Sequence, residues 1–145
     1  MMSVITDDLI LSFRIHDLKF GLNIRDIQEV NVMPELLLVP GQNKITIGMI
    51  NLHGITAPVV ALDKLLKIKS NNKPKKLFIA IISPKGPICF VVDELLGFDV
   101  LTENRINILE DAKSNIDTSY FKSVYFKGKE MTPILKVDAF SNLEL

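Results

Sequence analysis

The sequence has few of the residues that build disulfide scaffolds, thiolate metal clusters or membrane spans. Cys89 is the only cysteine among 145 residues, so neither an internal disulfide nor a multi-thiolate site can form. No apolar run approaches the roughly 18 residues of a membrane-spanning helix. The first residues also lack the basic and apolar regions of a signal peptide. We therefore expect a cytoplasmic protein that does not insert into membranes.

An excess of charge of one sign is also absent. Lys and Arg together number 17, as do Asp and Glu, which gives a formal net charge of zero. Non-specific nucleic-acid binding depends on clustered positive charge and, for single strands, on aromatic side chains that stack on bases. The chain has no Trp and only two Tyr. We expect no nucleic-acid partner, and an OB-like nucleic-acid-binding module stays a distant alternative.

Catalytic constellations are missing as well. The two histidines, His16 and His53, lie in separate predicted turns and have no metal-ligand spacing. The neighbouring carboxylates Asp93 and Glu94 point to opposite faces of a strand, so they cannot act as an acid and base on one substrate. Cys89 lies within an apolar strand, which favours a buried, inert thiol. We expect no catalytic residue, no metal site, no cofactor and no enzymatic activity.

The chain does contain many short segments in which apolar and polar residues alternate. Residues 9–15 and 19–24 predict one β-hairpin, and residues 77–82 and 88–92 predict another. Between them, the lysine-rich segment KIKSNNKPKK at residues 67–76 is typical of a solvated linker.

An internal repeat accompanies these hairpins. APVVALDKL at residues 57–65 matches TPILKVDAF at residues 132–140 without a gap. Both segments contain a proline, two aliphatic residues, an aspartate at the same position and a final large apolar residue. A repeat of about 70 residues rich in brief strands predicts two small β-barrels with a short helix after each proline-led strand.

These patterns predict the following organisation. Residues 1–8 form a disordered tail and residues 9–145 a single domain. The predicted parts are a first barrel at about 17–68, a linker at 67–76, a second barrel at about 77–137, a strand at 9–16 that the second barrel can share, and a C-terminal helix at 137–145.

Four motifs in a fixed order indicate a family. They are Phe20–Ile24 followed by Ile27–Val30, GMINLHG at 48–54, APVVAL at 57–62, and FVVDEL at 90–95. In these motifs the chain resembles CheW, the adaptor family that couples chemoreceptors to the histidine kinase CheA in bacterial chemotaxis. The resemblance extends from about residue 9 to residue 143.

The resemblance implies an all-β fold of two five-stranded SH3- or OB-like barrels, packed on a shared hydrophobic seam, and no catalysis. It implies two partners: the regulatory CheW-like domain of CheA, and the cytoplasmic signalling tip of a chemoreceptor, held in a groove between the barrels. The receptor-binding positions that it transfers are Ile27, Glu29, Val30, Asn51, Leu52, His53 and Gly54. The kinase-binding positions are Leu36, Leu37, Val39, Ile45 and Ile47, although the leucines of this loop are equally explained as a cap on the first barrel's core.

The chain departs from the family pattern at several positions. His53 replaces an arginine and Ala61 an aspartate; Ser123 replaces a glycine and Lys136 an acid. We hypothesise that Glu29 and His53 approach one another, so that binding depends on the proton of His53, whereas an arginine would be charged at all relevant pH values. A neutral turn residue at position 53 is the alternative. The departures also leave open a CheW-like adaptor of another receptor–kinase pathway, such as type IV pilus twitching motility.

Overall fold

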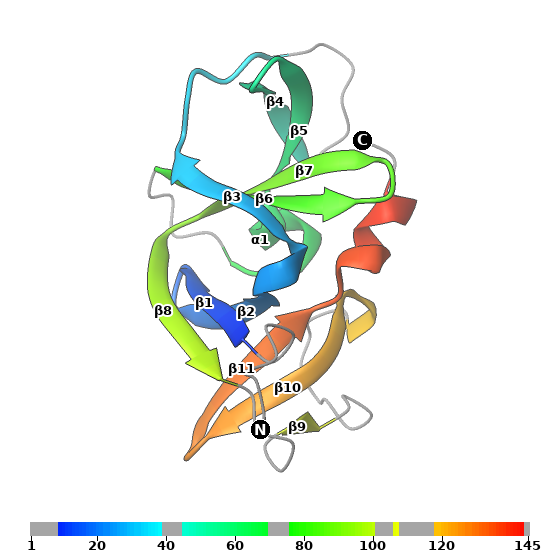
Figure 1. Cartoon of the computed structure of the whole chain (residues 1–145). Helices are drawn as coiled ribbons and strands as arrows, with labels where there is room; N and C mark the ends of the chain where they lie inside the picture. The colour runs from blue at the N-terminus through cyan, green and yellow to red at the C-terminus, as the bar shows by residue number, and fades with distance from the viewer. Residues whose placement is uncertain (1–8, 39–44, 70–75, 101–105, 108–117, 144–145) are drawn as a thin grey trace, which may run out of the picture.

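The computed structural model describes residues 9–38, 45–69, 76–100, 106–107 and 118–143, and its strands form two sheets (Figure 1). The six-stranded sheet has the order β8 (Glu94–Val100), β1 (Leu9–Ile15), β2 (Leu18–Asn23), β11 (Glu130–Leu135), β10 (Phe121–Lys127) and the two-residue β9 (Ile106–Asn107). The five-stranded sheet has the order β3 (Ile27–Val32), β6 (Leu77–Ser83), β7 (Gly86–Val92), β5 (Ile55–Val60) and β4 (Thr46–Leu52). The predicted all-β fold class is confirmed. Below, each sheet with its interior is called the six-stranded or five-stranded lobe.

Helical structure is limited to short segments among the described residues. They are η2 (Ile24–Asp26), α1 (Leu62–Leu65), η4 (Thr118–Tyr120) and η5 (Val137–Asn142). The predicted C-terminal helix is therefore a 3₁₀ helix at 137–142. The predicted tail at 1–8 and most of the predicted linker lie outside the described residues.

The two halves of the chain exchange their first hairpins. The β1–β2 hairpin pairs with β8 and β11 from the second half, while β6–β7 pairs with β3 and β5 from the first half. This arrangement differs from the predicted barrels at 17–68 and 77–137, because each of those ranges contains strands of both sheets. Both hairpins carry the same apolar alternation, so a local pattern does not distinguish pairing within a half from pairing between halves.

The predicted shared seam is present as the largest hydrophobic core. One face of the β1–β2 hairpin and one face of β6–β7 supply it, together with buried residues of α1 and η5. The rings of Phe90 on β7 and Phe140 on η5 lie 4.8 Å apart between centroids, and those of Phe20 and Phe121 lie 5.9 Å apart. A fully buried side chain of this size stabilises the fold by roughly 1.5–3 kcal/mol. The seam therefore joins the lobes into one folding unit.

The interiors of the two lobes differ in chemistry. The five-stranded lobe is filled by apolar side chains, namely Ile50, Leu52, Ala57, Val59, Phe78, Ala80, Cys89 and Val91. The six-stranded lobe has a much smaller apolar cluster of Ile10, Tyr125 and Ile134, beside the buried hydroxyls of Ser12 and Thr132. Alternation alone did not predict this difference between the repeats.

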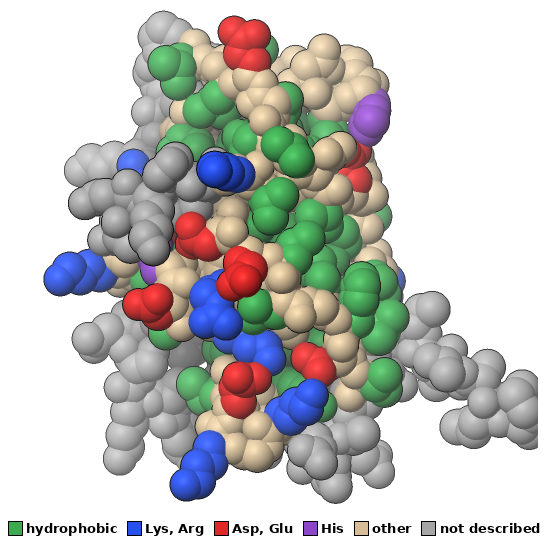
Figure 2. Space-filling model, turned by 90° about the vertical axis from the view of Figure 1, so that its left-hand side faces the viewer, with side chains coloured by type: hydrophobic (Ala, Val, Ile, Leu, Met, Phe, Trp, Pro, Cys, Tyr) green, Lys and Arg blue, Asp and Glu red, His purple; other side chains and the backbone are tan. Residues whose placement is uncertain are grey.

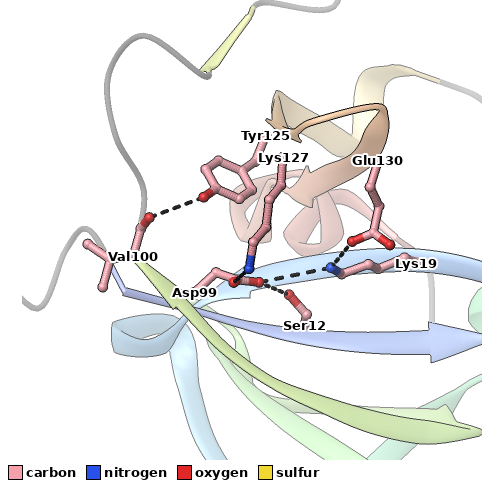
Figure 3. A network of polar contacts seen from close by, with 7 residues as sticks. All are labelled: Ser12, Lys19, Asp99, Val100, Tyr125, Lys127 and Glu130. Atoms are coloured by element: carbon pink, nitrogen blue, oxygen red, sulfur yellow. Dashed lines mark hydrogen bonds and ion pairs between the residues drawn. The ribbon is translucent and has the colours of Figure 1, made fainter.

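Charged side chains of the six-stranded lobe form a network of hydrogen bonds and ion pairs (Figure 3). Ser12 Oγ donates to Asp99 Oδ2 at 3.2 Å, and Lys127 Nζ lies 3.4 Å from Asp99 Oδ1. Lys19 Nζ lies 2.5 Å from Glu130 Oε1 and 3.9 Å from Asp99 Oδ2. Because β8 carries Asp99 and β10 carries Lys127, these contacts connect strands on opposite sides of the sheet order.

A candidate partner-binding surface

The turn between β4 and β5 is held in shape by its own residues. Leu52 pairs with Ile55, which leaves a two-residue loop of His53 (φ 54°) and Gly54 (φ 88°). Tight hairpin loops with both φ angles positive favour glycine and tolerate few other side chains, histidine among them. Asn51 Oδ1 accepts a hydrogen bond from the Gly54 N–H at 2.7 Å. Asn51 and Gly54 therefore set the turn that presents His53.

His53 and Glu29 connect the two outer strands of the five-stranded sheet. Nε2 of His53 lies 2.6 Å from Oε1 of Glu29, which confirms the predicted approach of these residues. Glu29 belongs to β3 and His53 follows β4, and these strands stand at opposite ends of the sheet order. The sheet must therefore curl back on itself for the two side chains to meet. The Glu29 side chain is 21% exposed and that of His53 is 75% exposed, so the imidazole covers a largely shielded carboxylate.

The carboxylate of Glu29 stands at the rim of an apolar interior. Glu29 pairs with Ala80, which pairs with Cys89, so the three residues form a row across the sheet. Burial raises the pKa of the Cys89 thiol to about 12, and the Glu29 charge contributes further to this increase. A thiol with this pKa stays protonated and is a poor nucleophile. The interior position of Cys89 agrees with the inert role expected for it.

The apolar residues of the predicted receptor set divide into two groups. Ile27 pairs with Ile81 and Val30 with Ile79; both are half-buried and pack against the shared core. A register shift between Ile27 and Glu29 accommodates an extra residue on β3. Leu52, by contrast, is buried inside the five-stranded lobe with 3% exposure. Its side chain supports the turn from below and does not face a partner in this conformation.

An apolar surface lies on the side of the molecule that β3 and β8 border. Hydrophobic side chains form a continuous band on this face, with a histidine and an acidic side chain near its upper end (Figure 2). The exposed large apolar residues of these two strands are Val32, Leu95, Phe98 and Val100. The β8 residues were absent from the predicted site. The sequence pattern that could have indicated these exposed residues is the alternation of Phe98 and Val100 around Asp99, in a strand that ends its sheet.

The predicted kinase-binding residues lie around the segment before β4. Leu36 packs on the interior of the five-stranded lobe, and a Cβ built on Gly48 would stand 2.7 Å from its Cγ. Ile47 is half-buried against the same interior, and Ile45 against the shared core. Leu37 exchanges two backbone hydrogen bonds with Met49 and keeps a 49% exposed side chain. Val39 lies outside the described residues.

The leucines of this loop divide between the core and the surface, and their role as kinase contacts stays a prediction. Leu36 caps the core, while Leu37 and Leu38 face outward, with Leu38 78% exposed. Ile55, which follows the turn, adds a further exposed side chain at 56%. Ile55 was not among the predicted contacts, although its place directly after the Gly54 turn could have indicated exposure.

The described residues contain neither a metal-ligand cluster nor a membrane-spanning helix. Within these ranges no group of three or more His, Cys, Asp or Glu side chains could hold a metal ion. No helix in the same part of the chain is long and apolar enough to span a bilayer.

Two joined β-lobes, an apolar surface and a braced turn define a protein-binding module of the SH3-like double-barrel class. The sequence model of the CheW-like domain matches residues 9–144, and the chain therefore belongs to the CheW-like family. Members of this family are non-catalytic scaffold proteins of chemotaxis, which confirms the prediction that the chain is not an enzyme.

Individual relatives agree with this assignment. The chain is 30% identical to the chemotaxis protein CheW of Thermotoga maritima over 129 residues, which cover 89% of this chain and 78% of the relative. It is 22% identical to the probable chemotaxis protein CheW of Rhizobium etli, over 95% of this chain and 90% of the relative. The crystal structure of the scaffolding protein TtCheW from Thermoanaerobacter tengcongensis has the same fold, with a TM-score of 0.85, 23% identity and 94% coverage of both chains.

Proposed function

We propose that this protein is a cytoplasmic adaptor that couples the signalling tip of a chemoreceptor to the histidine kinase CheA. The observation that carries the proposal is the set of exposed apolar side chains on β3 and β8, where β3 also carries Glu29, the partner of His53. Large contiguous apolar patches on a protein surface mark interaction sites. Family membership supplies the chemotaxis context.

The receptor tip binds along β3 and β8. An amphipathic helix places apolar side chains in a groove at helical spacing, and Ile27, Val30 and Phe98 offer apolar area for such anchors. The Glu29–His53 pair offers polar contacts at the rim, where charges contribute more to specificity than to affinity. Asn51, Leu52 and Gly54 act by holding the turn in place.

The regulatory domain of CheA binds the segment before β4 together with Ile55, which follows the β4–β5 turn. Leu37, Leu38 and Ile55 are exposed there, and Leu36, Ile45 and Ile47 support them from below. Val39 is proposed as a contact from its sequence position alone.

A second candidate function is favoured by the residues that depart from the family pattern. His53 stands where the pattern has an arginine, at the exposed tip of the turn. An adaptor of another receptor–kinase pathway, such as twitching motility, would select for a different side chain at this position.

The receptor surface is tested by placing a charge on it. Val30→Lys should weaken binding to a purified receptor tip at least roughly tenfold, since a lysine in the contact would be desolvated. Gln28→Lys is the matched control, because Gln28 lies on the same strand and is already exposed. Circular dichroism checks that both variants are folded.

The kinase surface is tested in the same assay. Leu38→Glu should weaken binding to the CheA regulatory domain and leave receptor binding unchanged, and Lys122→Glu is a control on the exposed face of β10. If the wild-type protein bound neither the receptor tip nor the CheA regulatory domain, the proposed function would be overturned. Binding to a kinase and receptor of a different pathway alone would favour the second candidate.

A further inference from the structure

A buried histidine joins three segments that belong to different lobes. His16 lies in the turn between β1 and β2, and its side chain is only 5% exposed. Its Nε2 lies 3.1 Å from Oδ2 of Asp63, on α1, and its Nδ1 lies 3.7 Å from Oδ2 of Asp93, between β7 and β8. The turn belongs to the six-stranded sheet, whereas α1 follows a strand of the five-stranded sheet.

The direction of these hydrogen bonds is set by chemistry. A carboxylate only accepts, so the imidazole donates from Nε2 to Asp63. The main-chain N–H of His16 donates to Asp93 Oδ2 at 2.5 Å, and the Asp93 N–H donates to the carbonyl of Arg14 at 3.0 Å. The β1–β2 turn is therefore bonded to both segments through its backbone and its side chain.

Both aspartates stand where a small displacement would move one lobe against the other. Asp93 is the single residue between β7 of the five-stranded sheet and β8 of the six-stranded sheet. Asp63 belongs to the one turn of helix whose Leu62 and Leu65 enter the shared core. A contact that holds these positions to the β1–β2 turn restricts rotation about the junction.

We propose that His16 is a positioning residue that clamps the two lobes and thereby fixes the shape of the surface formed by β3 and β8. These strands end different sheets, so the relative setting of the lobes determines how their apolar side chains are spaced. The consequence for receptor binding rests on the proposed function, whereas the clamp itself does not.

The turn of the second half that corresponds to the β1–β2 turn has no histidine. Ile15 pairs with Leu18 around the first turn, and Ser83 pairs with Gly86 around the corresponding turn of the second half. Pro84 thus occupies the position of His16, and its side chain has no polar atom. The internal repeat alone therefore does not account for the histidine at position 16.

The clamp is tested by measuring the orientation of the lobes. His16→Asn suits the left-handed backbone of this residue (φ 55°) and is too short to reach Asp63. Residual dipolar couplings of amides should still fit each lobe separately but no longer fit one rigid arrangement of the two. Asp63→Ala should cause the same change, and the double variant should add little to it. His16→Gln, whose amide nitrogen can replace Nε2, should restore most of the wild-type arrangement.

Receptor binding supplies the second measurement. His16→Asn should weaken binding to a purified receptor tip roughly three- to tenfold, although it changes no exposed surface residue. Lys122→Glu, on the exposed face of β10, is the control and should leave both the lobe orientation and receptor binding unchanged. Unchanged couplings in both His16→Asn and Asp63→Ala would overturn the clamp. If the wild-type protein bound no receptor tip, the proposed function would fail while the couplings would still decide the clamp.

Discussion

His53 Nε2 lies 2.6 Å from Glu29 Oε1, and this contact joins the first and last strands of the five-stranded sheet. The pair is attractive as an ion pair only while the imidazole carries a proton. A partner that covers the turn would remove water from the carboxylate and increase the cost of leaving it without a positive neighbour.

Receptor binding should therefore depend on the charge at position 53. His53→Arg places a permanent positive charge beside Glu29, whereas His53→Gln cannot carry a charge. The Gln variant should bind the receptor tip roughly three- to tenfold more weakly than the Arg variant. Isothermal titration calorimetry measures both affinities. Equal affinities of the two variants would contradict the prediction.

The pKa of the Glu130 carboxyl should lie below the usual value of a glutamate. The hydrogen bond from Lys19, with the charge of the same lysine, lowers its pKa below 4.5. Its favourable contribution is thus present above pH 4.5 and is lost as pH falls through the lowered pKa. Side-chain carbon NMR should show the pKa increasing in Lys19→Met. Lys127→Met, which removes a weaker influence, should change it less; an equal effect of both variants would contradict the assignment.

The Cys89 thiol should resist modification in the folded protein. Burial raises its pKa from 9.0 to about 12, so almost no thiolate exists at pH 8. An aromatic disulfide reagent should label it only after urea unfolds the chain, and rapid native labelling would contradict its burial. Because the folded pKa is raised, this group's contribution to stability is complete below pH 9 and is lost as pH rises toward 12.

Neither α1 nor η5 has a side-chain cap at its N-terminus. Ala61 precedes α1 and Lys136 precedes η5, and neither side chain makes a capping hydrogen bond. Lys136 is exposed, so Lys136→Asp should stabilise the protein by about 0.5–1 kcal/mol through a new acceptor for the first backbone N–H groups. Urea unfolding measures the change, with Lys136→Ala as control. Equal stability of the Asp and Ala variants would show that no cap forms.

The sequence predicted those features that depend on local pattern and on family motifs. Alternation predicted the strands, the ungapped match of 57–65 with 132–140 predicted two similar lobes, and the family motif led to the Glu29–His53 contact. The hairpin exchange was not predictable because β1–β2 and β6–β7 have equivalent alternation. Pairing between halves is decided by packing across the whole seam.

The site was predicted less completely for a related reason. Residue identity placed Leu52 in the binding motif, but only the sheet register shows that its side chain points into the lobe. His16 was predicted to lie in a turn, and nothing in its neighbourhood indicated Asp63 or Asp93, which are 47 and 77 residues away. Contacts between distant segments require the topology.

A single co-sedimentation experiment tests whether this protein bridges a receptor to a kinase. Vesicles that display the receptor's cytoplasmic tip are mixed with CheA, with or without this protein, and the pelleted kinase is measured. We predict that CheA pellets only when the protein is present, and that Val30→Lys and Leu38→Glu each reduce the amount of pelleted kinase. Equal amounts of pelleted kinase with and without the protein would contradict the account.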